Sequence, residues 1–176
     1  MELVAAVSRG LIALVFLASA ASKVRPADHR EFRASVRRTG LVPARAVRPA
    51  ALLVVALEAA VVPLVLVPAT ASLGAALAAL LLAGFVGVIV VAVRTGRAVE
   101  CRCFGAGATL GAQHVARNAF LLLACLGATQ APPPFTAGAA PQLACGFVVA
   151  GLLALAVTRL DDVLDLLRHR TVLRES

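Results

Sequence analysis

The sequence predicts an all-α integral membrane protein, a compact bundle of about five transmembrane helices built as one membrane domain over residues 1–176. Two observations support this fold class. First, 61% of the residues are hydrophobic and 15% are charged, whereas soluble domains are about 45–50% apolar and about 25% charged. Second, the apolar residues gather in five runs, each near the roughly 20 residues that a helix needs to cross a bilayer. A helix is suited to lipid because it satisfies its own backbone hydrogen bonds.

The predicted spans cover residues 3–22, 50–67, 71–93, 115–130 and 143–158. The first run contains Ala18-Ser19-Ala20, which resembles a signal-peptide cleavage site. No basic segment precedes that run, so we expect an uncleaved span. The last two runs are the shortest, and an alternative for them is a helical hairpin that enters and leaves the membrane by one face.

The loop of residues 23–49, between the first two spans, is strongly basic. Within it, Asp28 to Thr39 predicts a short helix that Gly40 ends, with Phe32 and Val36 one turn apart on one face. Such a helix suits the headgroup layer, where its arginines meet the anionic lipids of the bilayer. No aromatic residues alternate with these basic residues as they do on a nucleic-acid-binding surface, so we expect no nucleic-acid partner.

The basic residues lie on one side of the predicted topology. In a five-span arrangement, the loops 23–49 and 94–114 and the tail 159–176 share a side and hold Lys23 and fourteen arginines. The loops on the other side, around residues 69–70 and at 131–142, hold no Lys or Arg. The positive-inside rule therefore predicts a multi-pass protein of the cell membrane with its N-terminus outside and its tail in the cytoplasm.

Two ionisable residues stand inside the apolar runs, Arg9 in the first and Glu58 in the second. A charge at membrane depth costs at least about 2.5–3.5 kcal/mol, and it usually faces a partner or a wet cavity. We interpret the two as a buried ion pair between antiparallel spans that fixes helix register. A second hypothesis makes Glu58 a proton acceptor coupled to thiol chemistry.

Cys101 and Cys103 form the most informative motif, Cys101-Arg102-Cys103-Phe104-Gly105, in the loop that follows the third span. A disulfide between two such close cysteines closes a small ring that we expect to be strained, and strained disulfides are readily reduced. Arg102 favours the thiolate, which is the nucleophile in thiol–disulfide exchange. The motif thus indicates a redox-active dithiol. The alternatives are simple packing and a metal site, which is disfavoured because no second cysteine pair follows.

Cys125 and Cys145 fall in the outer halves of the fourth and fifth predicted spans. Lone cysteines in membrane helices usually just pack. If the two helices are neighbours, however, these thiols could form a second pair and relay electrons across the membrane.

The residues resemble the MauE family of methylamine utilisation, which is related to the DoxX-like membrane proteins. The resemblance covers roughly residues 5–130 and is most specific in C-x-C-F-G with Arg117-Asn118 opening the next helix. It implies a four-helix DoxX-like core plus one further helix. It also implies Cys101 and Cys103 as the redox pair. The remaining positions that match the family pattern, whose role the resemblance does not define, are Arg9, Lys23, Glu58, Arg117 and Asn118.

The resemblance further implies a thioredoxin-like partner and the maturation of an exported disulfide-containing protein of the methylamine dehydrogenase type. No cofactor is evident, and the sequence does not decide on a quinone, on the oligomeric state or on whether the protein is an enzyme. Disulfide maturation occurs outside the cytoplasm, yet the charge rule puts Cys101 and Cys103 inside. Either a cytoplasmic thiol donor feeds electrons outward, or the loop dips into the membrane, or the span count is wrong by one. The rival function is a non-enzymatic membrane scaffold or assembly subunit; a small-solute transporter ranks third.

Overall fold

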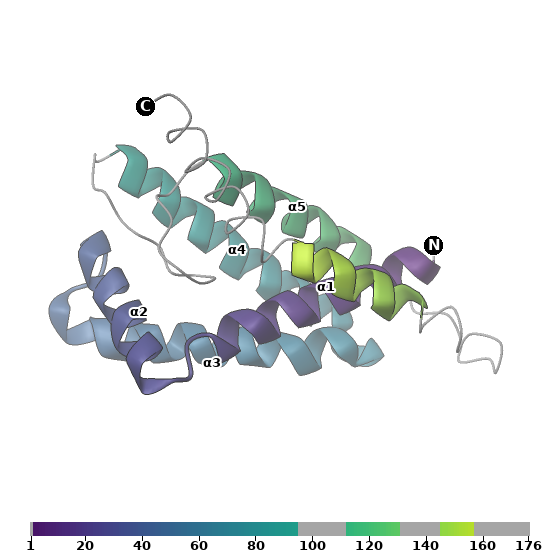
Figure 1. Ribbon diagram of the computed structural model, residues 1–176, viewed down its shortest axis with the longest axis horizontal. Coiled ribbons are helices and arrows are strands. Elements are labelled where there is room, and N and C mark those ends of the chain that lie inside the picture. Colours follow the sequence, from purple (N-terminus) through teal and green to yellow (C-terminus); the bar gives the residue numbers. More distant parts are fainter. Residues whose placement is uncertain (1, 95–111, 131–144, 157–176) are drawn as a thin grey trace, which may run out of the picture.

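The computed structural model describes residues 2–94, 112–130 and 145–156. This part of the chain is helical and connected by short turns (Figure 1). Its helices are α1 (Glu2–Ala21), α2 (Pro26–Thr39), α3 (Val47–Leu66), α4 (Ala71–Arg94), α5 (Ala112–Ala128) and a last apolar helix, Cys145–Ala156. Two 3₁₀ turns, η1 (Ala44–Ala46) and η2 (Pro68–Thr70), precede α3 and α4. The all-α prediction is confirmed.

Four helices form the core of the bundle. α1 packs against α3 and α5, and α4 packs against the same two helices, so α1 and α4 lie on a diagonal. The core is built from fully buried apolar side chains that include Ile12, Phe16, Val61, Leu82 and Leu121. The C-terminal end of α1 and of α4, the first turns of α3 and α5, and α2 all lie at one end of the bundle, which we call the α2 end (Figure 1).

Tight helix contacts explain the short connection between α3 and α4. Pro68 cannot continue a helix, and η2 turns the chain within three residues. A Cβ on Gly74 would lie 2.5 Å from the backbone nitrogen of Val65. Only glycine allows this approach. Thr70 closes the turn by donating its hydroxyl to the carbonyl of Leu64 at 2.9 Å.

The amphipathic basic helix that the sequence predicts is present as α2. Pro26 stands in its first turn, and Gly40 ends it with φ of 68°, donating its N–H to Arg37. Phe32 and Ser35 are buried on its inner face, while Val36 is half-buried. The observed helix begins two residues before the predicted start and ends where predicted.

The last helix, Cys145–Ala156, packs on α1. A Cβ on Gly10 would meet Ala150 at 2.9 Å and the ring of Phe147 at 3.2 Å. Ala150 and Ala154 belong to the same core cluster as α1. The last helix is therefore part of the same packed bundle as α1.

Three helical segments are long and apolar enough to cross a membrane: Leu3–Ala21, Ala44–Leu66 and Pro68–Val91. The fourth and fifth predicted spans appear as shorter apolar helices, Val115–Ala128 and Cys145–Ala156. Bulky side chains such as Leu53, Leu80 and Leu123 are more than half exposed on the outer faces, as expected of helices surrounded by lipid. Membrane embedding is thus supported.

α5 is short, but it extends along most of the bundle. Gly127 packs against Ser8 of the antiparallel α1. Because both helices rise about 1.5 Å per residue, the start of α5 lies near the level of Lys23. α5 therefore runs from the α2 end to the opposite end of the bundle (Figure 1).

Candidate functional site

A buried ionic cluster of Lys23, Glu58 and Ser19 lies toward the α2 end. Glu58, on α3, is 0% exposed, and Lys23, just past the end of α1, is 1% exposed. The Lys23 Nζ donates to both carboxylate oxygens of Glu58 at 3.0 Å. It also donates to the Ser19 hydroxyl at 2.6 Å, and that hydroxyl donates to Glu58 Oε1 at 3.0 Å. The three side chains therefore form a closed hydrogen-bonded triangle.

Local backbone geometry brings Lys23 into this triangle. The N–H of Lys23 bonds to the carbonyl of Ala20, so the chain continues the turn of α1 for two more residues. Residues four apart share a helix face, and this places Lys23 beside Ser19. The ammonium then reaches back into the bundle, where it also bonds to the Ser19 carbonyl at 3.0 Å.

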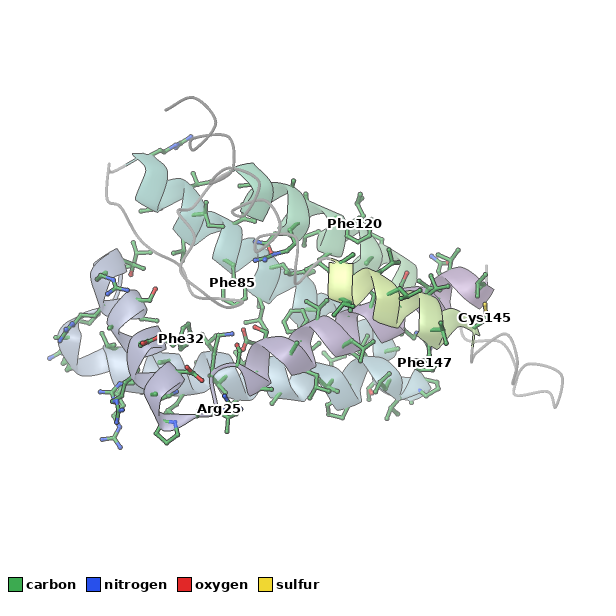
Figure 2. The ribbon with its side chains drawn as sticks, viewed as in Figure 1. Arg25, Phe32, Phe85, Phe120, Cys145 and Phe147 are labelled. Carbon is green, nitrogen blue, oxygen red and sulfur yellow. The ribbon has the colours of Figure 1, made fainter. Side chains whose placement is uncertain are left out.

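α2 covers the cluster. The Lys23 Nζ lies 5.4 Å from the centre of the Phe32 ring, and Phe32 is 5% exposed. An ammonium over an aromatic face is attracted by the ring quadrupole. Figure 2 shows Phe32 on the side of α2 that faces the bundle. α2 is therefore tied to the cluster as well as to the surface.

The expected ion pair between Arg9 and Glu58 is wrong. Glu58 pairs with Lys23, and Arg9 lies ten residues before Ser19 on α1. At about 1.5 Å per residue, that separation is roughly 15 Å along the helix axis, which is beyond the reach of an arginine side chain. The two charges lie at different depths.

Arg9 instead caps the C-terminus of α5. Its Nε donates to the carbonyl of Ala128 at 3.0 Å, and its Nη2 donates to that of Gln130 at 2.6 Å. The last carbonyls of a helix lack partners within the helix, and a cation there also complements the helix dipole. Beside this cap, a Cβ on Gly127 would collide with the Ser8 side chain. Arg9 and the Ser8–Gly127 contact therefore join α1 to α5.

Arg117 and Asn118, on α5, are also buried, at 6% and 2% exposure. With Gly127 opposite Ser8, they align with residues 17 and 18 of α1, close to the level of Ser19. The Asn118 Oδ1 is buried and accepts no hydrogen bond from the described residues. Every charged or amide position of the family pattern is thus an interior position: one caps α5, two form the ion pair and two lie on α5 at the depth of that pair.

Cys101 and Cys103 lie outside the described residues. The described helices on either side of them end at Arg94 and begin at Ala112, and both of these points are at the α2 end (Figure 1). Chain connectivity therefore makes the segment that holds the C-x-C motif leave and rejoin the bundle at the end that contains Lys23 and Glu58.

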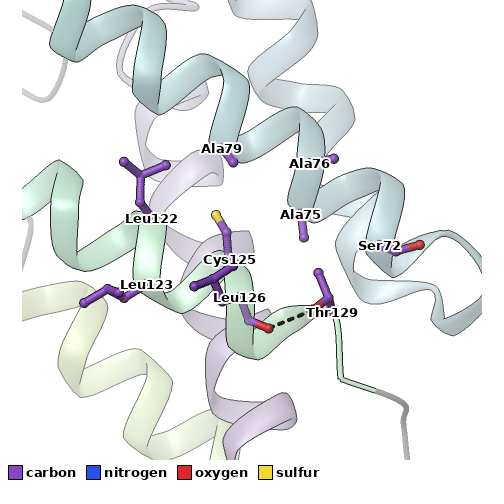
Figure 3. Close-up of a pocket in the computed structure, with 9 residues that line it drawn as sticks. All are labelled: Ser72, Ala75, Ala76, Ala79, Leu122, Leu123, Cys125, Leu126 and Thr129. Atoms are coloured by element: carbon purple, nitrogen blue, oxygen red, sulfur yellow. Dashed lines mark hydrogen bonds between the residues drawn. The ribbon is translucent and has the colours of Figure 1, made fainter.

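Cys125 and Cys145 are both free thiols. Cys125 is 3% exposed, and its sulfur points into a cavity of about 340 Å³ between α5 and α4, lined by Ala75 and Ala79 (Figure 3). Cys145 is exposed and begins the last helix at the end opposite α2 (Figure 2). The proposed second pair stays a prediction. Among the described side chains, no three His, Cys, Asp or Glu gather as a metal site requires.

Sequence reasoning missed Ser19, Phe32 as a contact of Lys23, and the partners of Arg9. Of these, only the role of Ser19 could have been predicted from the sequence, because Ser19 and Lys23 are four residues apart at a helix end. The positions of Phe32 and of the Arg9 partners depend on how separate helices dock.

Residues 1–131 match the family model described as "Methylamine utilisation protein MauE". Neither a curated protein nor a solved structure matches the chain significantly. The matched region contains α1 to α5, the ionic cluster, Arg9, the Arg117–Asn118 pair and both cysteines of the C-x-C motif. Since the match covers most of its 176 residues, the chain belongs to the MauE family.

Proposed function

We propose that this protein is a membrane component of methylamine utilisation that exchanges thiol and disulfide equivalents with a thioredoxin-like partner through Cys101 and Cys103. Membership of the MauE family implies the role in methylamine utilisation. The observation that carries the redox mechanism is the C-x-C motif itself, inside the matched region, on a connection anchored at the α2 end. The client would be an exported disulfide-containing protein of the methylamine dehydrogenase type.

The exchange needs two sulfurs and no further cofactor. The thiolate of one cysteine attacks a sulfur of the partner's disulfide; that S–S bond breaks, the partner's other sulfur leaves as a thiolate, and a mixed disulfide forms. The second cysteine loses its proton and attacks the mixed disulfide, which releases the partner as a dithiol. Two electrons have then passed to the partner, and Cys101 and Cys103 share a disulfide. A second thioredoxin-like dithiol restores the pair by the same steps.

In this proposal the ionic cluster has a structural role and takes no part in the thiol exchange itself. A proton on Glu58 would leave the Lys23 ammonium buried without its counter-charge, and breaking a buried pair in that way costs several kcal/mol. We therefore assign Glu58 and Lys23 to holding α1, α3 and α2 together at the α2 end, where the described helices on either side of the C-x-C motif end and begin. The alternative role of Glu58 as a proton acceptor would require the pair to separate during the reaction.

The proposed orientation follows from charge. The α2 end carries the basic residues, so the positive-inside rule places it in the cytoplasm and the N-terminus outside. Cys101 and Cys103 would then meet a cytoplasmic thiol donor. Cys125 and Cys145, which lie in the other half of the bundle, would pass the electrons outward as a second pair.

A scaffold function is the second candidate, and one observation favours it. Arg9 and the Lys23–Glu58 pair, the ionisable residues of the interior whose contacts are known, each make hydrogen bonds that join two elements of the bundle. Such residues would be needed by a purely structural subunit as well. The scaffold hypothesis predicts that the thiols of the C-x-C motif are dispensable.

Acid-quenched thiol trapping in intact cells tests the redox proposal. We expect Cys101 and Cys103 of the wild type to shift between reduced and oxidised forms, and a single Cys103→Ser or Cys101→Ser variant to accumulate a mixed disulfide with a thioredoxin-like protein. Ala106→Ser, in the same connection, is the matched control and should behave as wild type. If the thiols stay reduced under every condition and neither variant forms an adduct, the redox proposal is wrong and the scaffold function is the better account.

A further inference from the structure

A second site lies on the other side of α2 from the ionic cluster. It is a cavity of about 310 Å³ between α2, η1 and the first turn of α3. Four arginines line it, three from α2 and one from α3, together with small or apolar residues. The lining is Arg30, Arg33, Ala34, Arg37, Ala44, Val47 and Arg48.

The arrangement concentrates positive charge in one concave place. Arg30, Arg33 and Arg37 follow the three- and four-residue spacing that puts side chains on one helix face, and Arg48 faces them from the next element. The Lys23–Glu58 ion pair described above involves none of these four guanidinium groups. Like charges at such spacing repel one another, and an anion bound in the cavity would offset that repulsion.

One hydrogen-bond donor of these arginines is buried. The Arg33 Nε is buried and has no hydrogen-bond partner among the described residues. A buried N–H without an acceptor costs about 1–3 kcal/mol, and an acceptor in the cavity would remove that cost. Because the guanidinium group presents donors in a planar fork, its best-matched acceptor is the paired oxygens of a phosphate or carboxylate.

The position of the cavity points to phosphate. It lies at the α2 end, beside the first turn of an apolar helix that is long enough to cross a bilayer. Basic pockets next to spanning helices are where phospholipid headgroups bind. Val47, which is buried and lines the cavity, provides apolar surface on the side toward the span.

We propose that this arginine pocket binds a phosphate group, and that the group belongs to the headgroup of an anionic phospholipid. The bound lipid links α2 to α3 on the face that the Lys23–Phe32 contact does not reach. This site is separate from the thiol chemistry and stands whether or not the redox proposal is right.

The test measures lipid binding to the purified full-length protein by native mass spectrometry. The probes are phosphatidylglycerol, zwitterionic phosphatidylcholine and inorganic phosphate. The pocket variant Arg33→Gln/Arg37→Gln is compared with Arg25→Gln/Arg38→Gln, which removes the same charge from exposed positions that do not line the cavity. Arg33→Lys/Arg37→Lys keeps the positive charge but removes the planar, paired N–H donors of the guanidinium groups.

We expect wild type and the exposed-site variant to retain phosphatidylglycerol over phosphatidylcholine, and the pocket variant to lose about thirtyfold in affinity, which corresponds to roughly one kcal/mol for each of its two arginines. The lysine variant should fall between them. Competition by millimolar inorganic phosphate would show that the phosphate group itself is bound, whereas lipid that inorganic phosphate does not displace identifies the lipid as the ligand. Equal losses in the pocket and exposed-site variants would overturn the proposal. If the double variant does not fold, Arg48→Gln on the exposed start of α3 is measured instead against Arg45→Gln.

Discussion

Replacing Lys23 by Met should destabilise the protein far more than any other single loss of positive charge around α2. In the folded protein the Lys23 ammonium has four acceptors within 3.0 Å, and two of them are the oxygens of the fully buried Glu58. Met keeps the length of the side chain and its packing, so the change isolates the charge. Glu58 then keeps only the Ser19 hydroxyl as a donor.

The expected loss is about 3–5 kcal/mol, the cost of leaving one member of a buried ion pair uncompensated. For a chain of this size, roughly 2–4 °C of unfolding midpoint corresponds to each kcal/mol. The midpoint in detergent should therefore fall by about 6–20 °C, as measured by the thermal loss of the monodisperse peak in size-exclusion chromatography.

The double variant Lys23→Met/Glu58→Leu separates charge from packing. Replacing both partners of a buried pair by apolar residues is often close to neutral, so the double variant should regain most of the stability that Lys23→Met loses. Arg25→Met is the matched control, because Arg25 is exposed two residues further along, and it should change stability by no more than about 0.5 kcal/mol. The reasoning fails if Lys23→Met and Arg25→Met are equally stable, or if the double variant is no better than the single one.

Two further predictions concern the opposite half of the bundle. Gly127→Val should destabilise the protein by about 1–3 kcal/mol, because its side chain overlaps that of Ser8; Gly84→Val, where an added Cβ meets nothing within 4 Å, is the control for a thermal-unfolding comparison, and equal losses would contradict the close approach of α1 and α5. In natively folded Cys101→Ser/Cys103→Ser protein, maleimide should label the exposed Cys145 rapidly and the buried Cys125 only after denaturation, as read by intact mass; fast addition of two labels would contradict the burial of Cys125.

The helices and their order could be predicted from the sequence because each depends on local patterns. The apolar runs predict the spans, and Pro26 and Gly40 mark the ends of α2. The resemblance also selected interior residues well: Arg9, Lys23 and Glu58 are all buried. A charged residue that an apolar bundle retains must make enough contacts to offset its desolvation, so it stands out in the sequence.

The pairing of those residues could not be predicted in the same way. Arg9 and Glu58 looked like partners because both interrupt apolar runs, but depth along the helix separates them. Lys23 looked like a loop residue, and only the continued turn of α1 brings it back to Ser19. The arginine pocket is partly readable, since the spacing within α2 is helical, but its fourth member on α3 depends on how two elements dock.

The most direct test of the central claim is growth on methylamine in cells that depend on this chain, with the membrane abundance of each variant measured in parallel. We predict that Cys101→Ser/Cys103→Ser is present at wild-type abundance yet fails to support growth, and that the exported client accumulates with incorrectly paired disulfides, while Ala106→Ser grows normally. Normal growth and normal client disulfides in the double cysteine variant would contradict thiol exchange at the C-x-C motif.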